Sequence, residues 1–236
     1  MPNGRRIGFR HFDGSGPMVV FLPGYMSDMA GSKATALADW AEAHGRQYLL
    51  VDYSGCGESD GQFANGTLGR WADEVVAVVE ARASVPVVLV GSSMGGWLML
   101  EVTRALGERV AGLVGVAAAP DFTEWAYTAA EKRRFAAGET VWRDNPYGSD
   151  PTPTHAGFWH DGQARLCLDR PIAFDGPVRL LHGFDDHEVP SSVSLRLAEA
   201  LRSQDVQVTL VKHGDHRLSR EPDIALLLRT VASLTE

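Results

Sequence analysis

Short runs of aliphatic residues recur along the chain and are separated by longer segments that carry an apolar stripe. Seven runs have the length of strands, at 7–12, 18–22, 48–52, 87–90, 113–118, 178–181 and 206–211. Several are continuous Val/Leu runs without alternation, which is typical of strands buried on both faces of a sheet. The pattern therefore predicts a mostly parallel central sheet of about seven or eight strands.

Amphipathic spacing marks the segments between these runs as helices. Five such segments lie at 32–44, 67–83, 94–106, 192–201 and 224–234. In the second, Thr67 suits the N-cap position, and Leu68, Trp71 and Val75 share one face. Gly45 follows the first segment as a helix stop. Alternating strands and helices predict an α/β fold with helices on both faces of the sheet.

Residues 121–176 interrupt this alternation. A helical stretch at 122–137 precedes a segment rich in Pro, Gly, His and aromatic residues. About 40 residues without a clear period are unusual inside a compact domain and often form a lid or a binding loop. We therefore expect a single domain, residues 1–236, with a lid insertion at approximately 121–176, hereafter the lid.

The composition excludes several classes of function. Apolar residues make up 44% of the chain and charged residues 22%, as in soluble globular proteins. A net charge of −8 argues against a nucleic-acid partner and against a polybasic membrane patch. The longest apolar run, 110–119, is about half of a membrane span, so we expect no stable membrane insertion.

The two cysteines, Cys56 and Cys167, do not make a disulfide framework and favour a reducing compartment. No apolar segment follows the first six residues, so the pattern of a signal peptide is missing. We expect a bacterial-type cytoplasmic location, with the mitochondrial matrix as the alternative if the chain is a processed form. The sequence leaves the oligomeric state open.

The strongest chemical signal is the motif Gly91-Ser92-Ser93-Met94-Gly95. It matches G-x-S-x-G between a predicted strand and a predicted helix, which is the context of a nucleophile elbow. The elbow holds its serine in a strained turn, and small flanking residues let strand and helix pass closely. We predict that Ser93 is a nucleophile; the alternative is a tight structural turn.

A serine nucleophile needs a base, and in chains with this elbow an acid and then a histidine follow the serine. Asp185 and Asp186 come after the sixth predicted strand, and His213 and His216 come after the seventh. Carboxyl ends of parallel strands meet at one edge of the sheet, so these loops converge. We favour His216 over His213 as the base. The H-x-x-H spacing also suggests a metal site, but no third or fourth ligand follows, so we predict none.

Two main-chain amides are candidates for an oxyanion hole. The residue after the nucleophile, Met94, supplies one amide from the start of its helix. The loop after the second predicted strand supplies the other, and Gly24 allows that loop to turn sharply. We predict that the amide of Tyr25 is this second donor.

These motifs resemble the α/β-hydrolase superfamily over nearly the whole chain. A closer similarity, from about residue 21 to 231, is to the mitochondrial acyl-glucuronide esterase and palmitoyl-protein thioesterase family. The segments that carry it are Gly24-Tyr25-Met26-Ser27, Asp52-Tyr53-Ser54-Gly55, Thr67-Leu68-Gly69-Arg70-Trp71, the elbow and its helix through Leu100, and Arg179-Leu180-Leu181-His182-Gly183.

The resemblance implies an α/β-hydrolase fold and a serine esterase or thioesterase. The pattern H-G-x-x-D-x-x-V-P of related hydrolases implies Asp186, rather than Asp185, as the acid beside Ser93 and His216. His182 at its start is then a histidine that packs the loop. No cofactor is implied. The substrate is expected to be a small-molecule ester or acyl thioester, such as an acyl glucuronide or an S-palmitoyl thioester.

Substrate contacts are expected from the lid. Trp125, Trp142 and Trp159 are either lid core or the wall of an acyl site. Arg143 suits a bidentate contact with a substrate carboxylate. Two alternative functions remain open: a peptidase or C–C bond hydrolase on the same scaffold, and a non-catalytic ligand-binding homologue.

Overall fold

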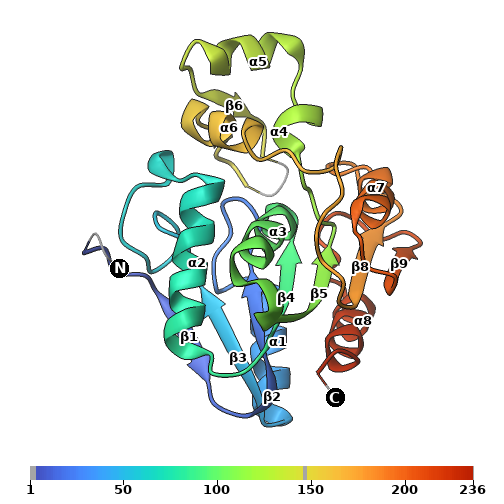
Figure 1. Ribbon diagram of the computed structural model, residues 1–236. Helices are drawn as coiled ribbons and strands as arrows, with labels where there is room; N and C mark the ends of the chain where they lie inside the picture. The colour runs from blue at the N-terminus through green and yellow to red at the C-terminus, as the bar shows by residue number, and fades with distance from the viewer. Residues whose placement is uncertain (1–3, 146–147, 236) are drawn as a thin grey trace.

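A seven-stranded sheet forms the centre of the computed structural model, which describes residues 4–145 and 148–235 (Figure 1). Its strand order is β1-β3-β2-β4-β5-β8-β9, and only β1 runs antiparallel to its neighbour. The strands are β1 (Phe9–Phe12), β2 (Ser15–Leu22), β3 (Arg46–Val51), β4 (Val87–Ser92), β5 (Val110–Val116), β8 (Val178–Gly183) and β9 (Val206–Val211). The predicted, mostly parallel sheet is confirmed.

Helices cover both faces of the sheet, and each face has its own apolar core. Helices α2 (Leu68–Arg82), α3 (Met94–Leu106) and α7 (Ser192–Ala200) pack on one face, where Val20 and Leu89 point. Helices α1 (Ser32–Ala43) and α8 (Glu221–Ala232) pack on the other, where Val19 and Val88 point. Successive strand residues therefore alternate between two buried faces, which explains the continuous apolar runs.

Most helix boundaries agree with the sequence pattern, but α8 begins three residues before the predicted start at 224. Pro222 lies in its first turn, where a missing N–H breaks no intrahelical hydrogen bond. The described ranges also contain two short 3-10 turns outside the lid, η1 (Phe63–Asn65) and η2 (Gly107–Arg109), and neither has a buried residue. No helix in the described ranges is long and apolar enough to cross a membrane.

The lid lies above the carboxyl ends of the central strands (Figure 1). It contains α4 (Phe122–Trp125), α5 (Ala129–Ala136), a hairpin of β6 (Val141–Arg143) and β7 (Thr152–Thr154), and α6 (Ala156–Gln163). The prediction of one helical stretch followed by irregular chain was wrong. Thr128 begins a new helix through a capping box with Glu131, so the stretch is divided in two.

A small core of its own holds the lid together. Phe135 stacks on Trp159 at 5.4 Å between ring centroids, and Trp159 Nε1 donates to Thr123 O at 3.0 Å. Arg165, which follows α6, bonds Glu101 of α3 at 2.6 Å and Asp161 at 3.0 Å. We propose on these contacts that the lid and the sheet belong to one domain.

Candidate active site

Ser93 stands at a sharp turn between β4 and α3. Its φ of +54° and ψ of −121° are sparsely populated for a residue with a side chain. A Cβ at Gly95 would lie 2.0 Å from Leu22 O, and a Cβ at Gly91 would lie 2.3 Å from Gly95 O. Only glycine fits at these two positions, so the elbow geometry expected from the motif is present.

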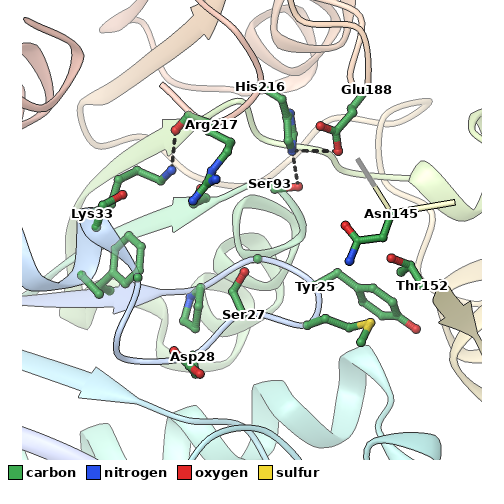
Figure 2. A pocket seen from close by; sticks show the side chains of 18 residues that line it. Tyr25, Ser27, Asp28, Lys33, Ser93, Asn145, Thr152, Glu188, His216 and Arg217 are labelled. Atoms are coloured by element: carbon green, nitrogen blue, oxygen red, sulfur yellow. Dashed lines mark hydrogen bonds and ion pairs between the residues drawn. The ribbon is translucent and has the colours of Figure 1, made fainter. Parts of the chain in front are cut away.

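A continuous chain of hydrogen bonds links Ser93, His216 and Asp186. His216 Nε2 lies 3.0 Å from Ser93 Oγ, and His216 Nδ1 lies 2.8 Å from Asp186 Oδ2 (Figure 2 shows the Ser93 contact). An ionised carboxylate only accepts, so Nδ1–H donates to Asp186 and Nε2 accepts from the serine hydroxyl. The structure therefore brings together three residues from distant segments.

The alternative acid and base form a pair of their own. His213 Nδ1 lies 3.1 Å from Asp185 Oδ2, and both side chains are exposed. His213 and His216 therefore face different carboxylates. Within the described ranges, no group of three His, Cys, Asp or Glu side chains is placed to hold a metal ion.

The side chain of Asp186 is fully buried and lies within hydrogen-bond distance of four groups. Its Oδ1 accepts from the amides of Glu188 and Val189, both at 2.9 Å, and His182 Nε2 lies 3.2 Å from Oδ2. Burial by itself raises the pKa of Asp186, but the hydrogen bonds from His182 and His216 outweigh it and hold that pKa well below its usual range. Asp186 is therefore an anion at neutral pH.

His182 does more than pack the loop. It is completely buried, Ser194 Oγ lies 2.7 Å from Nδ1, and Nε2–H donates to Val189 O at 2.9 Å. Its second Nε2 contact, to Asp186, helps to fix the position of that carboxylate. The signal in the sequence was its place at the end of a strand, at the start of the loop that carries Asp186.

The loop after β2 packs directly against the elbow. A Cβ at Gly24 would lie 3.3 Å from Ser93 Cβ and 3.4 Å from Ser92 O. In the described part of the chain, neither the Tyr25 amide nor the Met94 amide donates to an acceptor. Both N–H groups are thus available to an oxygen of a bound molecule, as an oxyanion hole requires.

The side chain of Tyr25 connects this loop to the lid. Its hydroxyl donates to Pro153 O in β7 at 3.0 Å. Its ring is surrounded by four other aromatic rings, those of Phe63, Trp71, Phe122 and Phe158. The position of the candidate oxyanion loop therefore depends on the base of the lid.

A pocket of about 440 Å³ opens at Ser93 and His216. Its wall includes the loop 23–28, the first turn of α1 and four polar residues outside them: Asn145, Thr152, Glu188 and Arg217. Figure 2 places Lys33 and Arg217 on one side of Ser93, and Asn145 and Glu188 on the other. Burial lowers the pKa of Lys33 to about 8, and the nearby Arg217 adds to that effect.

The structure does not bring the four lid candidates to this pocket. Trp125 Nε1 donates to Pro120 O at 2.8 Å, Trp142 is 57% exposed, and Trp159 belongs to the lid core. Arg143 donates two hydrogen bonds to Glu131, at 2.7 and 2.8 Å. The guanidinium also donates to the main-chain carbonyl of Ala126 in the lid, so its hydrogen-bond donors are used within the lid.

The pocket residues that sequence reasoning missed are polar side chains on separate elements. Lys33 lies in α1, Asn145 comes after β6, Thr152 begins β7, and Glu188 comes shortly after Asp186. No short motif carries any of them. Only the folded arrangement of the core and the lid brings them together.

The chain belongs to the α/β-hydrolase family, whose model matches residues 19–226. It is 36% identical over 240 residues to the human protein named palmitoyl-protein thioesterase ABHD10, mitochondrial, covering all of this chain and 78% of the relative.

Two solved structures are similar. One is a protein from Agrobacterium vitis S4 described as a hydrolase, with a TM-score of 0.93 and 35% identity. The other is alpha/beta hydrolase domain-containing protein 10 from mouse, with a TM-score of 0.89 and 36% identity. Each comparison covers 98% of this chain and 94% of the other. The predicted fold and family are confirmed.

Proposed function

We propose that this protein is a serine hydrolase that cleaves carboxylic esters or thioesters through an acyl-Ser93 intermediate. The observation that carries the proposal is the hydrogen-bonded chain from Ser93 through His216 to Asp186, placed at an elbow that opens into a pocket. A serine hydroxyl, an imidazole and a buried carboxylate, hydrogen-bonded in this order, are the groups that activate a serine as a nucleophile.

In the acylation step, Ser93 Oγ attacks the substrate carbonyl carbon while His216 Nε2 takes the hydroxyl proton. Asp186 holds Nδ1–H and stabilises the imidazolium that forms. The tetrahedral intermediate then collapses. His216 returns the proton to the leaving alcohol or thiol, and the acyl group stays on Ser93. A water molecule then attacks the acyl carbon while His216 Nε2 takes one of its protons. The bond from the acyl carbon to Ser93 Oγ breaks, and His216 returns the proton to Oγ.

The amides of Tyr25 and Met94 hold the negative oxygen of the tetrahedral intermediate. Such preorganised donors act where charge develops, and losing one typically costs about 2.7–4 kcal/mol of transition-state stabilisation. Two observations support this assignment of the amides. The Tyr25 loop packs against Ser93 at Gly24, and Met94 begins α3, where main-chain N–H groups have no partner within the helix.

Acyl thioesters are our first candidate substrate class, because the curated relatives are named palmitoyl-protein thioesterases. Acyl glucuronides are the second, from the family resemblance. Neither a cofactor nor a metal is required by the chemistry. The expected cytoplasmic location finds no support in the comparisons, because the relatives bear mitochondrial names; a mitochondrial location is therefore the proposal we retain.

Hydrolysis of p-nitrophenyl esters of increasing acyl length tests this proposal, with Ser93→Ala as the blank. We expect activity that the blank lacks, and a kcat/KM that rises with chain length if a long acyl group binds. A short-chain optimum would instead indicate small esters or conjugates. Equal rates in the wild type and the blank would contradict the proposal and favour a non-catalytic binding protein.

A further inference from the structure

A second carboxylate lies beside the histidine, on its reacting side. Glu188 Oε2 is 3.9 Å from His216 Nε2, whereas Asp186 contacts the opposite ring nitrogen. Figure 2 shows Nε2 facing both Ser93 and Glu188, and Glu188 lines the pocket. The proposed acylation step assigns no role to this side chain.

The main chain of Glu188 is fixed by the same groups that hold the acid. Its amide donates to Asp186 Oδ1 at 2.9 Å. The next residue, Val189, donates its amide to the same oxygen, and its carbonyl accepts from His182 at 2.9 Å. Glu188 therefore starts from a rigid position, and its side chain, 40% exposed, reaches toward the pocket.

The separation of 3.9 Å is too long for a hydrogen bond and suits a bridge through one oxygen atom. His216 Nε2 accepts one hydrogen from an attacking hydroxyl, and a carboxylate oxygen of Glu188 accepts a second. Water carries two hydrogens on one oxygen. An alcohol carries one, as does the Ser93 hydroxyl, so only water satisfies both acceptors.

We propose that Glu188 positions the water molecule that hydrolyses acyl-Ser93, an inference that rests on the proposed function. The water oxygen forms a bond to the acyl carbon, and His216 Nε2 takes one water proton. Glu188 accepts a hydrogen bond from the other hydrogen, which stays on the water oxygen. The bond from the acyl carbon to Ser93 Oγ then breaks, His216 returns its proton to Oγ, and the carboxylic acid leaves.

Glu188→Ala and Glu188→Gln test this role by stopped-flow hydrolysis of p-nitrophenyl acetate, which separates acylation from deacylation. We expect Glu188→Ala to slow deacylation about 10-fold and to change acylation less than about threefold, so that a burst of p-nitrophenol becomes visible. Glu188→Gln keeps an acceptor oxygen and should lie closer to the wild type. Asp185→Ala, an exposed carboxylate in the same loop, is the matched control and should change neither step.

Added methanol provides a readout that a purely structural role does not move. Methanol and water compete for acyl-Ser93, and methanol has no second hydrogen on its oxygen to donate to Glu188. We expect the ratio of methyl ester to free acid to rise several-fold in Glu188→Ala and to stay near the wild-type ratio in Glu188→Gln and Asp185→Ala. An unchanged ratio in Glu188→Ala would overturn the inference.

Two further outcomes would also overturn it. If Glu188→Ala slows acylation and deacylation by the same factor, Glu188 acts through His216 and not through water. If Glu188→Ala speeds acylation by anionic esters and leaves deacylation unchanged, Glu188 only repels charged substrates.

Mass spectrometry of the acylated wild type distinguishes failure of this inference from failure of the proposed function. If no acyl adduct forms on Ser93, the proposed function fails; if it forms and the ratio does not shift, only this inference fails.

Discussion

The core and the lid both contain buried and half-buried polar side chains, but these groups have different partners. In the core, His182 and His216 converge on one point, the same oxygen of Asp186. In the lid, Arg143 and Glu131 pair only a short distance apart in the sequence and bring no group to the pocket. The comparison indicates that the core supplies the chemical groups, while the lid completes the pocket and supports the loop that carries Tyr25.

The largest expected effect separates the two histidines of the last core loop. His216→Ala removes the base, so kcat/KM for p-nitrophenyl esters should fall about 10³-fold or more. His213→Ala removes a surface histidine paired with Asp185 and should change kcat/KM less than about threefold. Steady-state kinetics of both variants, with circular dichroism as a check of folding, make the measurement. Comparable losses in the two variants would refute the assignment of His216.

Stability distinguishes a core glycine from a lid glycine. Gly95→Ala places a Cβ 2.0 Å from Leu22 O, so we expect a loss of about 1–3 kcal/mol or more in unfolding free energy, together with lost activity. A Cβ at Gly157 in α6 meets nothing within 4 Å, and Gly157→Ala should be neutral or stabilise by up to about 1 kcal/mol. Urea unfolding of both proteins tests the contrast, and similar free energies would contradict it.

The smallest effect concerns the ion pair of the lid. The hydrogen bond from Arg143 lowers the pKa of Glu131 to about 2. Because the folded pKa is depressed, the pair stabilises the protein above pH of about 4.5, and this contribution disappears as the pH falls toward 2. Arg143 is 41% exposed, so solvent screening keeps the gain below about 1 kcal/mol.

Arg143→Ala should therefore lower the thermal midpoint slightly at pH 7 and not at pH near 2. The same variant should leave KM within about twofold for neutral and for acidic esters, because Arg143 does not line the pocket. Arg134→Ala, which removes another exposed lid pair, is the control. A rise in KM for acidic esters alone would restore the expectation that Arg143 binds a substrate carboxylate.

Local signals were sufficient for the core. Short apolar runs, several of them continuous, marked its seven strands, and the elbow motif located Ser93 because only Gly fits on either side of the turn. Chain order and loop position reduced the candidate partners of Ser93 to Asp185 or Asp186 and to His213 or His216. The pattern of related hydrolases then implied Asp186, and in the structure His216 lies within hydrogen-bond distance of both Asp186 and Ser93. That these three residues carry out catalysis stays a prediction.

Local signals were insufficient for the lid. Its hairpin strands have three residues each, which is too short for alternating apolar and polar positions to mark a strand. Trp142 and Arg143 have side chains suited to substrate contacts, but the sequence does not show that the Arg143 guanidinium is already hydrogen-bonded to Glu131. Glu188 was missed for the same reason, because its significance depends on its distance from His216.

The most direct test of the account is covalent labelling with a serine-directed fluorophosphonate, followed by mass spectrometry of the intact protein and its peptides. We predict one adduct, located on Ser93, that is absent in Ser93→Ala and forms at least about 10²-fold more slowly in His216→Ala. Asp185→Ala should label at the wild-type rate. An adduct on another residue, or labelling of Ser93→Ala at the wild-type rate, would contradict the central claim that Ser93 is the nucleophile.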